Sequence, residues 1–196
     1  MMRMRTLPFL ILALLWSRGA AEEAITSLDL PDAKGVVHRI DEWAGRKAVV
    51  LFFVGVECPV SNFYAPEMER LHDEYSERGI AFRLIYSEPD ASVERVAAHV
   101  AEYRLSAEAL LDARQALARQ AGVTRVLTVV VASPGGGILY RGRIDDRFSE
   151  DGKRRDEPTT RELRDALDAV LAGKAPAARE TPVFGCPLPE VPADSR

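Results

Sequence analysis

Cysteine and histidine are both scarce in this 196-residue chain, which contains two cysteines and three histidines. Two cysteines are too few to form a framework of structural disulfides in a chain of this length, so a chemical role is the better interpretation. The histidines, at positions 38, 72 and 99, fall in separate expected elements and are expected on the surface. They form neither a Ser-His-Asp arrangement nor a metal-ligand spacing, and we therefore predict no metal site and no bound cofactor.

The chain also lacks an excess of positive charge. Its formal net charge is −4, and removal of residues 1–21, with three arginines and no carboxylate, would make it −7. An acidic protein without a basic patch is not expected to bind nucleic acid. About 175 remaining residues suffice for one domain with a sizeable core.

No segment after the first 21 residues is apolar enough to cross a membrane. Within those residues, arginines at positions 3 and 5 precede an apolar run at 7–16 and the small residues Gly19, Ala20 and Ala21. This pattern is typical of a secretory signal peptide, and it predicts an exported, periplasmic or otherwise extracytoplasmic protein. The protein would contact a membrane only if this segment stayed uncleaved as an anchor.

The periodic segments that follow predict an α/β domain over residues 22–173. Alternating or continuous apolar residues indicate strands, and a spacing of three and four indicates helices. The expected strands are 25–30 and 36–40, forming a hairpin, then 47–54, 80–86, 126–132 and 138–144, with a short element near 110–111. The expected helices are 59–78, 92–103, 114–121 and one opened by a capping box at 159–162 and closed by Gly173. Residues 174–196 form an extended tail rich in proline and alanine.

Cys58 is the most informative residue, because it lies where a buried strand ends and Pro59 begins a helix. Proline is favoured in the first turn of a helix, which places Cys58 at or just before the helix N-terminus. Free backbone N–H groups and the helix dipole favour a thiolate there. Cys58 is therefore a candidate nucleophile, and the neighbouring Glu57 is expected to point to solvent.

The chain resembles the thioredoxin-like superfamily, and more narrowly its exported redoxin branch, which is related to alkyl hydroperoxide reductases and thiol-specific antioxidant proteins. The resemblance rests on FFVGVECPVSN at 52–62, LYRGRIDDRF at 139–148, TTRELRDALDAVLAG at 159–173 and ETPVFGCPLP at 180–189. It implies a thioredoxin-like fold with a central mixed β-sheet flanked by helices. It also implies redox chemistry at Cys58, with Pro59, Ser61 and Asn62 around the thiolate.

Several positions depart from the patterns of this superfamily. Ser61 stands where a dithiol thioredoxin has its second cysteine, and Leu127 stands where thioredoxins place a cis-proline for substrate docking. A peroxiredoxin would have proline and a hydroxyl residue at positions 51 and 55, which are leucine and glycine here. A copper chaperone of this fold would have a second cysteine at Asn62, so copper binding is not expected.

Cys186, in the tail, offers the thiol that the motif lacks. If the tail folds back over the helix N-terminus, Cys186 can resolve a sulfenic acid or a mixed disulfide on Cys58. A permanent disulfide that pins the tail to the domain is the alternative, and a third possibility is that the two sulfurs never meet. Among the polar residues at 141–147, Arg143 is a candidate for stabilising the thiolate or binding an anion, whereas residues 145–158 are expected to form a solvated loop.

Three functions remain open at the level of the sequence. The first is thiol–disulfide exchange with a protein partner through Cys58, with Cys186 as a possible resolving thiol. The second is peroxidase activity on a small peroxide through the same cysteine, which would make the protein an antioxidant enzyme. The third is a non-catalytic binding module with a structural disulfide.

Overall fold

The computed structural model describes residues 23–149 and 152–191. The expected signal peptide at 1–21 lies outside the described residues. Within them, no helix is both long enough and apolar enough to cross a membrane.

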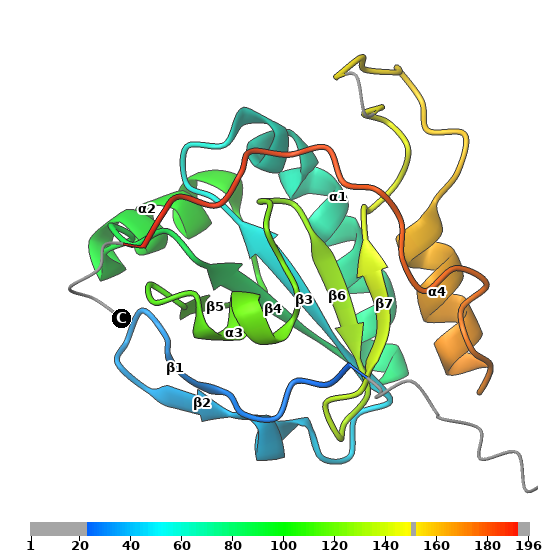
Figure 1. Cartoon of the computed structure of the whole chain (residues 1–196), viewed down its shortest axis with the longest axis horizontal. Coiled ribbons are helices and arrows are strands. Elements are labelled where there is room, and N and C mark those ends of the chain that lie inside the picture. Colours follow the sequence, from blue (N-terminus) through cyan, green and yellow to red (C-terminus); the bar gives the residue numbers. More distant parts are fainter. Residues whose placement is uncertain (1–22, 150–151, 192–196) are drawn as a thin grey trace, which may run out of the picture.

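A five-stranded mixed sheet in the order β5-β4-β3-β6-β7 forms the centre of the molecule (Figure 1). Strand β3 (Ala48–Val54) is its middle strand, parallel to β4 (Ile80–Tyr86) and antiparallel to β6 (Val129–Ala132). The edges are β5 (Glu108–Leu111), parallel to β4, and β7 (Ile138–Gly142), antiparallel to β6. All seven residues of β3 are buried, because elements pack on both faces of the sheet.

Three helices cover one face of this sheet: α1 (Pro59–Tyr75), α2 (Val93–Tyr103) and α4 (Glu162–Leu171). Helix α1 contributes Tyr64, Met68 and Leu71 to a core shared with alternate residues of β3 and with Leu163 and Leu167 of α4. Their spacing of three and four places them on one face of each helix, as the sequence predicts. A short 3₁₀ turn, Ser76–Arg78, follows α1 and leads into β4.

The opposite face carries the N-terminal hairpin, formed by β1 (Asp29–Pro31) and β2 (Val37–Arg39). A 3₁₀ turn, Ile40–Trp43, and the short helix α3 (Ala116–Gln120) complete this layer. Ile25, Leu28 and Trp43 pack here against the other set of alternate β3 residues. The hairpin, the helices and the buried strands β3, β4 and β6 agree with the sequence prediction.

Two local expectations were wrong. The capping box does not form, because the backbone N–H groups of Thr159 and Thr160 bond to the carboxylate of Asp146 at 2.6 and 3.0 Å instead of serving α4. Helix α4 begins at Glu162, and its N-cap, Arg161, has no side-chain capping bond. The loop that begins at Asp145 is not wholly solvated, since Asp145 and Asp146 are 3 % and 6 % exposed.

The tail after α4 follows a defined path over the domain (Figure 1, orange to red). It first runs beside β7, where the backbone N–H of Arg141 donates to Arg179 and that of Thr181 donates to Arg141. It then crosses the end of the sheet at which β3 leads into α1. Between these stretches, Phe184 stacks on Phe148, with ring centroids 5.8 Å apart. The tail therefore lies against the domain at several points.

Candidate active site

Cys58 is the N-cap residue of α1 and Pro59 its first residue, as the sequence predicts. The Asn62 backbone N–H donates to the Cys58 carbonyl at 3.0 Å and so begins the helix. The first turn of α1 holds no acidic residue. Cys58 is only 4 % exposed, whereas the neighbouring Glu57 points outward and pairs with Arg95 at 3.0 Å. The sulfur is thus set at the positive end of a helix dipole in a sheltered position.

The loop before Cys58 is held by side chains on both of its sides. The Val56 backbone N–H donates to Glu88 Oε2 at 3.0 Å, and Asn62 Nδ2 donates to the Val56 carbonyl at 3.1 Å. Ser61 is fully buried and accepts a long bond from the Gly55 N–H at 3.5 Å. Among the predicted residues, Ser61 and Asn62 therefore shape the loop that carries Cys58.

His99 extends this network into α2. Its Nε2 lies 2.9 Å from Asn62 Oδ1 and its Nδ1 lies 2.8 Å from the Tyr86 hydroxyl. The expectation of a surface histidine was wrong here, since His99 is 4 % exposed. Burial lowers the pKa of His99, so the neutral imidazole is favoured. A neutral ring can donate to the Asn62 oxygen and accept from Tyr86, which fixes the Asn62 amide for its bond to the loop.

The tail is fastened beside Cys58 through its backbone. The Val126 N–H donates to the Cys186 carbonyl at 2.8 Å, and the Leu188 N–H donates to Thr124 at 2.9 Å. Arg125 and Pro187 are partners in an antiparallel bridge. The Arg125 guanidinium also donates to the Gly185 carbonyl at 2.9 Å. Residues 185–188 therefore run antiparallel to 124–126, a segment just before β6, and are joined to it by one isolated bridge.

This pairing brings the two cysteines together. Both are free thiols, and the Cys186 thiol lies close enough to Cys58 to interact with it, although 128 residues separate them in sequence. Burial, and then the neighbouring Cys58, raise the pKa of Cys186 to about 11, and the negative charge of Glu88 adds to this effect. Cys186 thus keeps its proton at neutral pH and can donate it toward Cys58.

Two other predicted site residues have different surroundings. Leu127 is buried beside the docked tail, with a backbone φ of 70°, and its N–H donates to Phe53 in β3 at 2.6 Å. Arg143 is paired through its guanidinium with Glu162 of α4, its Nε 2.9 Å from Oε1. The described contacts of Arg143 connect α4 to the tail, where its N–H donates to Thr181, and do not include Cys58.

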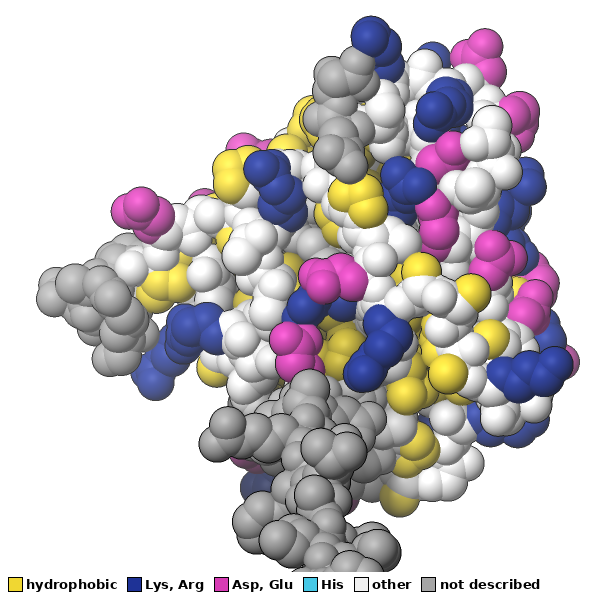
Figure 2. All heavy atoms as spheres, turned by 45° about the vertical axis from the view of Figure 1, so that its right-hand side comes forward, with side chains coloured by type: hydrophobic (Ala, Val, Ile, Leu, Met, Phe, Trp, Pro, Cys, Tyr) yellow, Lys and Arg dark blue, Asp and Glu magenta, His cyan; other side chains and the backbone are white. Residues whose placement is uncertain are grey.

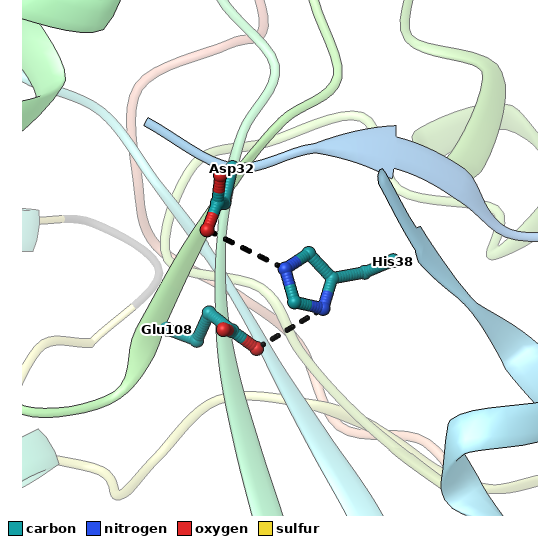
Figure 3. A group of neighbouring side chains, drawn as sticks. All are labelled: Asp32, His38 and Glu108. Carbon is teal, nitrogen blue, oxygen red and sulfur yellow. Dashed lines mark ion pairs between the residues drawn. The ribbon is translucent and has the colours of Figure 1, made fainter. Parts of the chain in front are cut away.

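A second buried polar cluster joins the hairpin to the edge of the sheet (Figure 3). His38 of β2 is 8 % exposed, which again contradicts the expected surface position, and lies between the carboxylates of Asp32 and Glu108, 3.5 and 3.3 Å away. Glu42 lies 2.9 Å from its Nδ1. Burial lowers the pKa of His38, but these carboxylates outweigh burial and raise it, which favours the imidazolium.

The donor atoms of Asp32, His38 and Glu108 lie within 4.8 Å of one another, close enough for a metal ion. However, carboxylates face both ring nitrogens, and Arg83 Nε is 3.2 Å from Glu108. The histidine and arginine cations already balance these carboxylates. The cluster is therefore better explained as an ionic connection between β2 and β5.

A charged hollow of about 500 Å³ lies between α1, α4 and residues of the segment that connects β7 to α4, among them Arg147, Asp156 and Glu157. Figure 2 shows acidic and basic side chains interspersed on the face that carries α4. Arg164 spans part of the hollow and pairs with Glu67 at 3.2 Å. The acidic and basic side chains of this hollow neutralise one another, so the hollow does not favour a ligand of either charge. The lining residues are Glu67, Arg70, Arg147, Asp156, Glu157, Arg161 and Arg164.

The sheet order and the Cys-Pro start of α1 define a thioredoxin-like fold. The redoxin family model matches residues 20–162, and the chain belongs to this family. It is 30 % identical over 135 residues to the thiol-disulfide oxidoreductase ResA of Halalkalibacterium halodurans, covering 67 % of this chain and 74 % of the relative.

Solved structures show the same fold. A hypothetical protein of Sinorhizobium meliloti 1021 superposes with a TM-score of 0.75 at 27 % identity, covering 85 % of this chain and 92 % of that one. A secreted disulfide oxidoreductase of Mycobacterium tuberculosis, described as homologous to E. coli DsbE, superposes with a TM-score of 0.52 at 19 % identity. This second match covers 74 % of this chain and 95 % of the other, and at that identity it shows the fold alone.

Sequence reasoning missed four residues of the site: Glu88, His99, Arg125 and Gly185. Glu88 follows a buried strand that is parallel to the one ending at Cys58, and the carboxyl ends of parallel strands meet at one edge. Its place just after this strand could therefore have predicted that Glu88 lies near Cys58. The roles of Arg125 and Gly185 depend on the path of the tail, for which prolines leave no periodic pattern.

Proposed function

We propose that this redoxin-family protein is a thiol–disulfide oxidoreductase in which Cys58 is the nucleophile and Cys186 the resolving thiol. The observation that carries the proposal is the docking of the tail, which holds the Cys186 thiol against Cys58 at the N-terminus of α1. The similarity to the thiol-disulfide oxidoreductase ResA supports the same reaction class. Cys58 and Cys186 together replace the cysteine pair that the Cys-x-x-Ser motif lacks.

The reaction proceeds in two exchanges. The Cys58 thiolate attacks one sulfur of a protein disulfide, forming a mixed disulfide, and the second partner sulfur leaves as a thiolate that takes up a proton. Cys186 then loses its proton and attacks the Cys58 sulfur, which expels the first partner sulfur. The partner disulfide is reduced to a dithiol by two electrons, and the protein becomes the Cys58–Cys186 disulfide. A protein dithiol donor returns it to the reduced form by the reverse steps.

The residues around Cys58 position its sulfur. Glu88 accepts from the backbone N–H of Val56 and Asn62 donates to its carbonyl, and together they fix the turn that carries the sulfur. The helix N-terminus supplies positive potential for the thiolate that forms and departs during exchange. No bound cofactor enters this scheme.

We further propose that the reaction takes place outside the cytoplasm. The support is the basic, apolar and small-residue pattern of residues 1–21. Export would also fit a protein whose reactive cysteine pair must persist in either redox state. Mass analysis of the mature protein after expression in a bacterial host tests this: a chain starting near residue 22 in the periplasmic fraction supports export, and a full-length cytoplasmic chain contradicts it.

Two cysteine variants test the reaction. With a protein disulfide substrate, Cys186→Ser should accumulate a mixed disulfide on Cys58, visible by non-reducing electrophoresis, because the resolving thiol is gone. Cys58→Ser should form none and lose turnover entirely. A Cys186→Ser variant that turns over at the wild-type rate would contradict the resolving role. Consumption of hydrogen peroxide at a rate far above disulfide exchange would identify a peroxidase instead.

A further inference from the structure

The tail binds the domain partly through backbone hydrogen bonds to a short edge, residues 124–126. Thr124 offers its carbonyl and Val126 its N–H, and the tail satisfies both through Leu188 and Cys186. Such an edge can accept an extended segment of another chain in the same register, because the bonds involve only backbone groups. Between them, the Arg125 guanidinium donates to the Gly185 carbonyl, so this contact also involves no side chain of the tail.

We propose that this edge, residues 124–126, docks an extended segment of the disulfide partner that carries a Gly-Cys pair, and that the tail is a tethered competitor for the same place. The proposal rests on the proposed function, since it names the partner segment that Cys58 attacks. In the docked segment, the partner glycine and cysteine take the positions that Gly185 and Cys186 occupy in the structure.

The requirement for glycine follows from the space at Gly185. A Cβ at this position would lie 2.0 Å from the Val126 carbonyl oxygen and 3.6 Å from the Leu127 Cβ. Gly185 is not among the residues with positive φ, so it is needed for space rather than for an unusual backbone conformation. The clashing atom is backbone of the docking edge, and a larger residue can be admitted only by moving one strand away from the other. The same clash would meet any partner residue with a Cβ in the position before the cysteine.

The flanking residues of the tail show what else the edge accepts. Leu188 is partly buried against the core cluster that includes Ile25 and Trp43. On the other side, the ring of Phe184 is nearly parallel to that of Phe148, with an interplanar angle of 9°. The partner segment is therefore expected to have an aromatic residue before the glycine and an apolar residue two positions after the cysteine.

Competition by the tail fits the order of the two exchanges. The tail leaves the edge, and the partner segment docks with its disulfide sulfur at the place of the Cys186 sulfur. Cys58 attacks that sulfur, and the other partner sulfur departs as a thiolate. When the tail returns, Cys186 attacks the Cys58 sulfur, and the partner thiolate is released from the edge. Release of the product and formation of the Cys58–Cys186 bond thus become the same event.

The test uses the full chain in a Cys186→Ser background, in which mixed disulfides accumulate. Two peptides that copy residues 180–190 are prepared, one with Gly-Cys and one with Ala-Cys, each joined by a disulfide to a chromogenic aromatic thiol. We expect the Gly-Cys peptide to react with Cys58 about tenfold faster, equivalent to about 1.4 kcal/mol. Equal rates for the two peptides would overturn the docking proposal.

A second variant tests the competition. Gly185→Ala, added to the same background, should lift the tail and raise the rate with the Gly-Cys peptide about tenfold, again about 1.4 kcal/mol. Gly135→Ala is the matched control, because a Cβ there meets no atom within 4 Å and the rate should not change. An unchanged rate in Gly185→Ala would contradict the tethered competitor.

A small symmetric aromatic disulfide without a peptide separates docking from simple exposure of Cys58. If Gly185→Ala accelerates this probe as much as the peptide, the tail acts only as a cover and the docking proposal fails. If Cys58 forms a mixed disulfide with neither the peptides nor the probe, the proposed function itself fails. If Cys58 reacts with the probe but the two peptides react at equal rates, the proposed oxidoreductase function is retained and the docking proposal is rejected.

Discussion

Two buried histidines support two regions of the molecule in opposite charge states. His99 lies behind the Cys58 loop with only neutral hydrogen-bond partners, Tyr86 and Asn62, and burial lowers its pKa. His38 lies under the hairpin among carboxylates, and its pKa is raised. The active-site region is thus positioned by neutral hydrogen bonds, while the hairpin is attached by ion pairs. The two regions should therefore respond differently to mutation and to pH.

Among the changes that distinguish these two regions, loss of the Asn62 amide should have the largest effect, and this effect should be on the exchange activity. Asn62→Ala removes the bond to the Val56 carbonyl and leaves His99 Nε2 without its partner. At about 1–3 kcal/mol for a buried unsatisfied group, we expect the disulfide-exchange rate to fall roughly tenfold to a hundredfold, measured as kcat/KM with a protein disulfide.

Gln120→Ala serves as the control for that variant. Its side-chain amide bonds Thr26 and Ser27 beside the hairpin layer, on the opposite face of the sheet from α1. Thermal unfolding should shift, whereas the exchange rate should stay at the wild-type value. An equal loss of exchange in both variants would mean that the amide network of Asn62 has no special link to Cys58.

His99 should make the protein less stable as the pH falls. Its pKa is lowered in the folded state, so its contribution is complete above the unfolded value of about 6.5 and is lost as pH falls through the folded pKa. Between pH 8 and pH 5, the wild-type Tm should fall more than that of His99→Gln, by about 2–4 °C, followed by thermal unfolding. Parallel pH profiles would contradict a buried neutral His99.

His38 should act in the opposite direction. Its pKa is raised in the folded state, so its contribution is complete below about 6.5 and is lost as pH rises through the folded pKa. From pH 6 to pH 9, the wild-type Tm should fall more than that of His38→Gln, by about 2–4 °C. Exchange activity should be unaffected by this variant. A larger fall in the variant would show that the imidazole is not held as a cation.

The smallest expected effect concerns Glu88. Its charge is one of the causes that raise the pKa of Cys186, although burial and Cys58 contribute more. Glu88→Gln keeps an acceptor for the Val56 N–H and removes the charge, so in a Cys58→Ser protein the pKa of Cys186 should be lower with this substitution than without it. The pH dependence of Cys186 alkylation in a Cys58→Ser background measures this, and an unchanged midpoint would place the Glu88 charge too far away to matter.

The sequence was informative where hydrophobic periodicity is strong. Strands β3 and β4 and helices α1 and α2 were predicted closely, because apolar residues repeat at the period of each element. Strand β5 was seen only as a short element near Leu110, since four residues carry little periodic signal. The capping box failed because Asp146, distant in sequence, binds the N–H groups of Thr159 and Thr160.

The candidate site was predictable in part. The place of Cys58 at the start of α1 follows from a strand that ends at a Cys-Pro pair, and the structure confirms that place. Its meeting with Cys186 could be posed only as one of several alternatives, because the tail is positioned by main-chain bonds to residues 124–126 that leave no residue pattern. Burial of His38 and His99 was missed for a similar reason, since their neighbours come from other elements.

The proposed function requires Cys58 and Cys186 to form a working redox pair. Non-reducing peptide mapping of the oxidised protein, followed by titration against a dithiol buffer of set potential, tests it most directly. We expect a Cys58–Cys186 disulfide with a reduction potential of about −200 mV, within the range of exchanging proteins. A bond that resists reduction below about −300 mV, as structural disulfides do, or two thiols that never pair, would contradict it.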